Sequence, residues 1–123
     1  MLPTFLIIGA QKAASTALWR MLTEHPDVFI PEMKETDFLL GTDQSGRGRA
    51  WYESLYEAAG EARHRGDASP SYSMFPFFRG VPERAAELVP EARIIYIIRH
   101  PVKRMISHWM NATSIGNEYR TIE

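Results

Sequence analysis

Two short apolar runs mark the clearest strands in the sequence. Residues Phe5–Ile8 form the first run, which ends at Gly9, and residues Ile94–Ile98 form the second. Neither run alternates apolar with polar positions, which is typical of strands buried on both faces, as in a parallel sheet. We therefore expect both strands in the interior of one sheet.

Helical spacing follows each run. After the first strand the apolar stripe comprises Ala17, Leu18, Met21 and Leu22; after the second, Pro101 opens a helix whose stripe comprises Val102, Met105, Ile106 and Trp109. The weaker signals between them are an extended piece at 28–31, a loop at Gly41–Gly48, helical spacing over 51–59, a strand and turn at 66–71 and a helix at 82–88. Strands alternating with helices predict an α/β fold of three layers, with a parallel central sheet and helices on both faces.

Composition narrows the function classes. The chain has 123 residues, with 14 Lys+Arg against 15 Asp+Glu and no cysteine. The absence of cysteine excludes a disulfide scaffold, a thiolate zinc site and cysteine catalysis. A net charge of -1 gives no overall attraction to nucleic acid or to an anionic membrane, so we expect neither partner. The run at Phe5–Ile8 is too short for a signal peptide or a membrane span, and we expect a cytoplasmic protein.

The loop after the first strand is a candidate anion site. It comprises Gly9, Ala10, Gln11, Lys12, Ala13, Ala14, Ser15 and Thr16, and it joins a buried strand to the start of a helix. Free amides and the positive end of the helix dipole favour oxyanions there. Compared with the nucleotide P-loop, Thr16 keeps the hydroxyl position, but the lysine lies earlier, at Lys12. The alternative is a tight turn with a solvated lysine and a capped helix.

A second candidate follows the second strand. Arg99 lies at its carboxyl end, where doubly wound sheets bind ligands, and Ser107 lies two turns along the next helix. A guanidinium suits phosphate because it donates two parallel hydrogen bonds. Taken alone, Arg99 could equally cap a helix or pair with a carboxylate, and Ser107 could be ordinary surface.

Together the two sites resemble a known family. FLIIGAQKAASTAL and IIYIIRHPVKRMISHW are similar to the two nucleotide-binding motifs of the sulfotransferases that use 3′-phosphoadenosine 5′-phosphosulfate (PAPS). GDASPSYS resembles that family's acid-x-[ST]-P-x-Y segment, and PEMKETDFL its Lys-Glu-x-x-[FY] element. The resemblance runs from about Phe5 to about Trp109 and implies a P-loop NTPase-like fold.

The resemblance also implies roles for residues. Lys12 would contact the phosphosulfate bridge, residues 9–16 would bind the 5′-phosphate, and Arg99 and Ser107 would hold the 3′-phosphate. Glu35 matches the glutamate taken as the base in the polysaccharide-modifying branch. The alternative for Glu35 is a solvated charge beside Lys34, and the other candidate bases are His25 and His108.

The implied reaction is transfer of a sulfuryl group from PAPS to a hydroxyl or amine of a small-molecule or carbohydrate acceptor, with no metal and with 3′,5′-ADP (PAP) as product. Two departures from the family pattern are Ala14, where glycine is common, and Ala68, where heparan-type members carry lysine. The second departure weakens the case for a sulfated glycosaminoglycan acceptor.

The length of the chain affects the choice among the possible functions. Family domains are about twice as long, so we expect residues 1–123 to form the nucleotide-binding part of a larger domain, completed by a longer chain, a partner or a second copy. The competing functions are a P-loop kinase and an inactive nucleotide-binding fragment that serves as an interaction domain.

Overall fold

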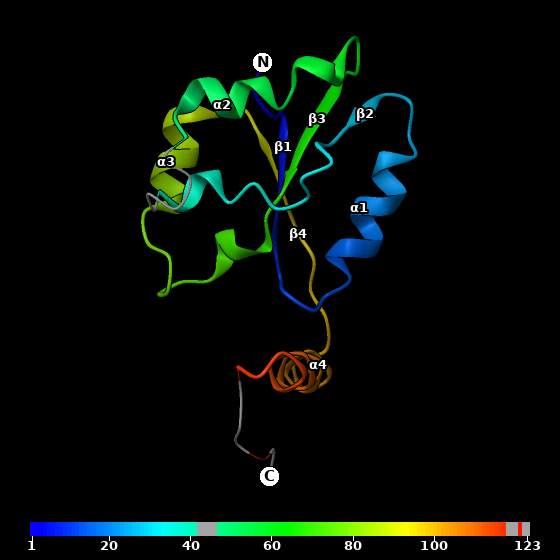
Figure 1. Cartoon of the computed structure of the whole chain (residues 1–123), viewed down its shortest axis with the longest axis vertical. Coiled ribbons are helices and arrows are strands. Elements are labelled where there is room, and N and C mark those ends of the chain that lie inside the picture. Colours follow the sequence, from blue (N-terminus) through cyan, green and yellow to red (C-terminus); the bar gives the residue numbers. More distant parts are fainter. Residues whose placement is uncertain (42–46, 118–120, 122–123) are drawn as a thin grey trace.

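Four parallel strands form the central sheet, in the order β2-β3-β1-β4 (Figure 1). The strands are β1 (Phe5–Gly9), β2 (Val28–Phe29), β3 (His64–Ala68) and β4 (Arg93–Tyr96). This computed structural model describes residues 1–41, 47–117 and 121. The predicted α/β fold with a parallel sheet is confirmed.

Helices cover both faces of the sheet, because β1 sends alternate side chains to opposite sides. Phe5 and Ile7 pack with Ile30 and Ala68 in one buried cluster, against which α1 (Ser15–Thr23) lies. Leu6 belongs to the opposite cluster, which the short helical segments and α3 (Val81–Leu88) cover. That second cluster comprises Leu6, Leu39, Leu40, Tyr72, Val81 and Val89.

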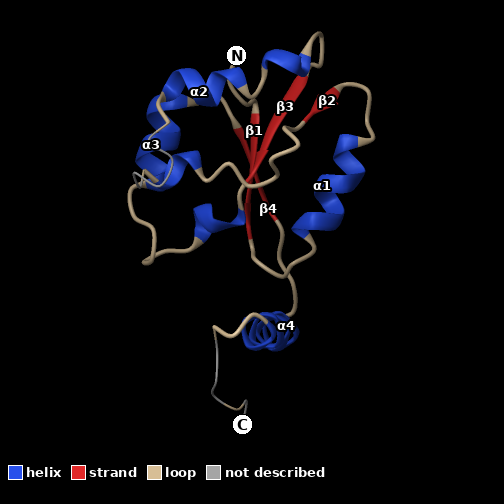
Figure 2. Ribbon diagram, in the orientation of Figure 1, coloured by secondary structure: helices blue, strands red, loops and turns tan. Residues whose placement is uncertain are grey.

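The remaining helical elements follow the chain around the sheet (Figure 2). They are η1 (Phe38–Leu40), α2 (Arg49–Ser54), η2 (Glu57–Ala59), η3 (Pro70–Ser73), α3 (Val81–Leu88) and α4 (Pro101–Ser114). α4 lies beyond the carboxyl end of β4 rather than over a face of the sheet, and none of its described residues is buried (Figure 1). No helix in the described ranges is both long enough and apolar enough to cross a membrane.

The prediction that the second strand is buried on both faces is wrong. β4 is an edge strand among the described elements, because it pairs with β1 alone. Ile94 is 55% exposed and Ile98, just beyond the strand, is 81% exposed. The helix that follows β4 does not fold back over the strand, so the apolar side chains on the outer side of β4 stay uncovered in this structure.

Two smaller predictions also differ from the structure, and a third falls partly outside the described residues. The helical spacing at 51–59 corresponds to two segments, α2 and η2, since α2 ends at Ser54. In α1 the packed face includes Trp19 with Leu18 and Leu22, whereas Met21 is 70% exposed. Of the predicted loop at Gly41–Gly48, residues 42–46 lie outside the described residues.

Candidate functional site

The loop after β1 begins with a glycine that the local geometry requires. Gly9 has φ 141°, a left-handed conformation that side chains disfavour, and a Cβ atom there would collide with the Ser73 hydroxyl. Backbone pairing between the ends of β1 and β4 continues past Gly9. Ile97 N–H donates to the Gly9 carbonyl at 2.7 Å, and Ala10 N–H donates to the Ile97 carbonyl at 2.9 Å. These bonds bring the loop beside the segment that carries Arg99.

The loop then turns into α1 through two left-handed residues. Lys12 has φ 60° and Ala14, the N-cap residue of α1, has φ 68°. No side chain caps this helix end, so its first-turn amides are free to bind a ligand. Ser15 is buried, whereas Thr16 is exposed beside the cleft described next.

A cleft of about 590 Å³ opens in front of this helix end. Its lining comes from the loop, the segment before η1, the start of η3 and the region from Arg99 into α4. The lining residues are Gln11, Lys12, Ala14, Ser15, Thr16, Lys34, Glu35, Pro70, Arg99, Ser107 and Asn111. The cleft therefore unites residues up to 100 positions apart in the sequence, and its volume lies within the range typical of ligand sites.

Most of the predicted site residues meet in this cleft. The three predicted site residues that do not line the cleft are Gly9, Ala10 and Ala13. All three are buried parts of the same loop. Three lining residues, Lys34, Pro70 and Asn111, were not among the predicted site residues. Asn111 follows Ser107 by four positions, so their shared helix face was a signal that could have identified it.

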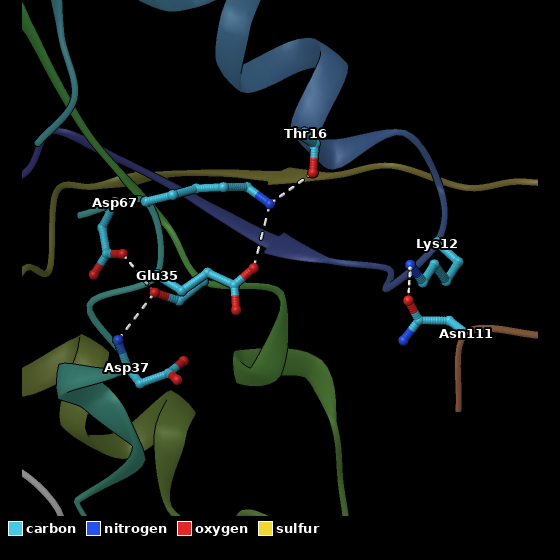
Figure 3. Close-up of polar contacts among 8 residues, drawn as sticks. Lys12, Thr16, Glu35, Asp37, Asp67 and Asn111 are labelled. Atoms are coloured by element: carbon cyan, nitrogen blue, oxygen red, sulfur yellow. Dashed lines mark hydrogen bonds and ion pairs between the residues drawn. The ribbon is translucent and has the colours of Figure 1, made fainter. Parts of the chain in front are cut away.

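Lys12 reaches from the loop to α4. Its Nζ donates a hydrogen bond of 2.8 Å to Asn111 Oδ1 (Figure 3). Both side chains line the cleft, so this contact spans it from the loop to the helix. Lys12 is half-buried and lines the same cleft as the amino end of α1, where its positive charge can neutralise negative charge on a ligand.

Arg99 supports the backbone of the loop through a hydrogen bond to Lys12. Its Nη1 donates to the Lys12 carbonyl oxygen at 3.0 Å, which leaves further donors of the guanidinium facing the cleft. Arg99 thus both supports the loop backbone and adds a second positive charge to the cleft.

A third cation comes from Lys34. Its Nζ donates to Thr16 Oγ1 at 2.8 Å and pairs with the Glu35 carboxylate at 3.2 Å (Figure 3). Glu35 therefore has a charged partner and also lines the cleft, so the two interpretations of this residue are compatible. Three cations and one carboxylate surround the same space.

The chain is similar to known proteins in both sequence and fold. The chain is 34% identical over 110 residues to a Caenorhabditis elegans bifunctional heparan sulfate N-deacetylase/N-sulfotransferase 1, covering 86% of this chain and 12% of that protein. It is 31% identical to human heparan sulfate glucosamine 3-O-sulfotransferase 6, covering 91% and 31% respectively. A sulfotransferase structure from Alicyclobacillus acidocaldarius superposes with a TM-score of 0.84 at 29% identity, covering 98% of this chain and 54% of that one.

The chain belongs to the sulfotransferase family. No family model matches it. It spans between about an eighth and a third of the length of these two curated relatives. The structural match extends over almost the whole chain, so the P-loop-like fold of the family is confirmed.

The expectation of a cytoplasmic location is wrong, because it disagrees with the relatives that the chain matches. The heparan sulfate sulfotransferases that the chain resembles are enzymes of the Golgi lumen. A short apolar run at the start of the sequence carries no information on the compartment in which such a domain works.

The two alternative bases lie apart from the cleft that Lys12 lines. His25 follows the carboxyl end of α1, where its Nδ1 accepts a hydrogen bond from the Asp27 amide at 3.1 Å. His108 lines a neighbouring cleft of about 900 Å³ between α4 and the segment after η3. Of the predicted bases, Glu35 alone lines the cleft with Lys12.

A second carboxyl group lies close behind Glu35. Burial raises the pKa of Asp37, a hydrogen bond from Ser71 opposes this rise, and the charges of Glu35 and Asp67 add to it. Asp37 also has φ 52°, and its Oδ1 has no hydrogen-bond partner among the described residues. Asp37 is thus a half-buried carboxyl group two residues from Glu35.

Proposed function

We propose that this chain forms the donor-binding part of a sulfotransferase that moves a sulfuryl group from PAPS to an amine or hydroxyl of a carbohydrate. The observation that carries the proposal is the convergence of Lys12, Arg99 and Ser107 on one cleft at the amino end of α1. The relatives named for N-sulfation and 3-O-sulfation of heparan sulfate support the acceptor class.

The residues fit an anionic donor. The free amides at the start of α1, with Ser15 and Thr16, suit the 5′-phosphate, and Arg99 with Ser107 suits the 3′-phosphate. Lys12 would stabilise the charge that develops on the bridging oxygen as the sulfur–oxygen bond breaks. Lys34, bonded to Thr16, adds positive charge on the other side of the loop.

Glu35 would take the proton that the acceptor loses as its nitrogen or oxygen bonds to sulfur. The carboxylate lies in the cleft, and the side chain is 45% exposed, so an acceptor can reach it. Its contact with Lys34 orients it toward the loop. In a loose, dissociative transfer of this kind, positioning and charge supply most of the catalysis.

The domain that completes the acceptor site extends beyond residues 1–123 in this proposal, either along a longer chain or through a second copy. The apolar side chains exposed on β4 and α4 support it, and so does the fraction of the A. acidocaldarius structure that this chain covers, 54%.

A transfer assay with radiolabelled PAPS tests the function. The acceptors are N-deacetylated heparan sulfate, which offers amines, and heparan sulfate, which offers hydroxyls. Lys12→Ala should lower turnover by about 100- to 1000-fold, because the leaving oxygen loses its cation, while PAP affinity falls much less. Lys103→Ala is the matched control, since Lys103 is an exposed lysine of α4 outside the cleft lining. Near-wild-type turnover in Lys12→Ala would refute the proposed role.

A further inference from the structure

Asp67 is the most deeply buried charged residue of the described structure, and the proposed chemistry does not use it. It lies at the carboxyl end of β3 with 0% exposure. The register pairs it with Leu6, so its side chain enters the cluster that η1 and η3 cover. A carboxylate in such a place is costly unless hydrogen bonds satisfy it.

Four hydroxyl groups satisfy this carboxylate. Oδ2 accepts hydrogen bonds from Thr36 Oγ1, Tyr52 Oη and Tyr72 Oη, each at 2.7 Å. Oδ1 accepts from Ser69 Oγ, also at 2.7 Å. Burial raises the pKa of Asp67, and these four hydrogen bonds oppose that rise. The two minor sequence motifs, GDASPSYS and PEMKETDFL, therefore join at one buried group.

The same group anchors the segment that carries Lys34 and Glu35. Residues 34–37 belong to no helix or strand, so regular backbone bonding does not place them. Thr36 binds Asp67 directly. The Asp37 amide donates at 3.1 Å to Ser69 Oγ, which itself donates to Asp67 (Figure 3). The next two amides complete the anchor: Phe38 N–H donates to Thr36 Oγ1 at 3.3 Å and Leu39 N–H to Tyr72 Oη at 3.2 Å.

We propose that Asp67 is a positioning residue for the donor-binding cleft. Through Thr36 and Ser69 it fixes the backbone from which Lys34 reaches Thr16 and from which Glu35 faces the cleft. Asp67 itself touches neither donor nor acceptor. This inference rests on the proposed function, and it assigns to the buried network a role beyond holding the fold together.

Two matched variants separate positioning from stability. Thr36→Val and Tyr52→Phe each remove one 2.7 Å hydroxyl bond to the same Oδ2 atom and keep the shape of the side chain. Thr36→Val also removes the contacts of Thr36 Oγ1 with the Phe38 amide and with Tyr72 Oη. Tyr52 lies in α2, remote in the chain from the 34–37 segment, and its ring would keep its stacking on Phe38. A purely structural network predicts that both variants lose stability and that neither disturbs the cleft. Positioning predicts that Thr36→Val alone disturbs the cleft.

The first measurement is turnover in the transfer assay, together with PAP affinity by calorimetry. We expect both variants to melt at lower temperature, but Thr36→Val alone to lower kcat, by about 10- to 100-fold, since small misplacements of a base are costly. PAP affinity should stay within about threefold in both, because the loop and Arg99 are untouched. Thr36→Ser should restore kcat, since it restores the hydroxyl. Equal kcat in Thr36→Val and Tyr52→Phe would overturn the proposal.

The second measurement is amide hydrogen exchange, which needs no activity. Thr36→Val should raise exchange at the amides of Asp37, Phe38 and Leu39, and Tyr52→Phe should leave them protected. If Thr36→Val does not fold, Ser69→Ala takes its place in this measurement. Ser69→Ala breaks the other link between Asp67 and the 34–37 segment, so it should raise exchange at the same amides. Unchanged exchange in the folded variant would refute positioning even if the wild-type chain transfers sulfate. Wild-type protein that binds no PAP would refute the proposed function instead, whatever the exchange result.

Discussion

Arg99 connects the two motifs of the cleft, and its contacts allow two roles to be separated. In this structure its guanidinium donates to the Lys12 carbonyl, and it also faces the space that Ser107 lines. The first contact supports the loop for any ligand. The second serves only a ligand that carries a 3′-phosphate.

Arg99→Ala should therefore weaken PAP more than AMP. We expect PAP affinity to fall by about tenfold or more, as for loss of a charge-assisted hydrogen bond, while AMP affinity falls by a smaller factor. Calorimetry with both nucleotides measures the difference. Equal losses for the two nucleotides would show that Arg99 supports the loop alone and does not bind the 3′-phosphate.

Individual residues differ in how well the sequence predicted them. Lys12, Arg99 and Ser107 were predicted from motifs that follow strand ends, and Glu35 was predicted from the family resemblance alone. The structure brings all four to one cleft. The network around Asp67 was not predicted. Thr36 and Asp67 are 31 positions apart, and hydroxyl groups of Thr, Ser and Tyr give no periodic signal that would connect them.

The start of α1 contains the clearest local strain of the site. Ala14 caps the helix at φ 68°, where an L-residue with a Cβ atom is disfavoured by about 1–2 kcal/mol. The residue is exposed, so its methyl group contributes no core packing that would compensate. Glycine, common at this position in the family, would adopt the same conformation freely.

Ala14→Gly should raise the free energy of unfolding by about 1 kcal/mol, because the left-handed conformation no longer costs energy. Ala17→Gly, at an exposed position inside the same helix, should lower it by about 1 kcal/mol through the poor helix propensity of glycine. Urea unfolding of the two variants checks the opposite signs. Destabilisation by both substitutions would contradict the left-handed cap.

The elements were predicted unevenly, for physical reasons. β1, its loop and α1 were predicted well because apolar run, turn and helical stripe follow one another within 20 residues. β3 was harder to predict, since its sequence, HRGDA, holds a single apolar residue, and its place in the sheet depends on pairing with β1 and β2. The burial of β4 was predicted wrongly because an apolar run does not reveal whether a neighbour covers it.

The difference between β1 and β4 makes a direct stability prediction. Ile7 is 0% exposed, and Ile7→Ala should lower the free energy of unfolding by about 2–5 kcal/mol, as for a buried isoleucine. Ile98 is 81% exposed, and Ile98→Ala should change it by no more than about 0.5 kcal/mol. Thermal or urea unfolding measures both. A large loss in Ile98→Ala would mean that β4 and the segment after it are covered in solution.

At the scale of the whole molecule, charge is balanced overall and concentrated locally. The net charge is -1, yet Lys12, Lys34 and Arg99 surround one cleft at the positive end of α1. The sequence motifs predicted Lys12 and Arg99, while Lys34 joins them through the fold. The donor-binding part of a sulfotransferase thus lies within residues 1–123 in our account.

Calorimetric titration of this chain with PAP, in metal-free buffer, tests that account most directly. We predict saturable binding at least about tenfold tighter than that of AMP, because the 3′-phosphate gains charge-assisted hydrogen bonds from Arg99 and Ser107. Absence of PAP binding, or binding of ATP that requires Mg²⁺ and excludes PAP, would contradict it.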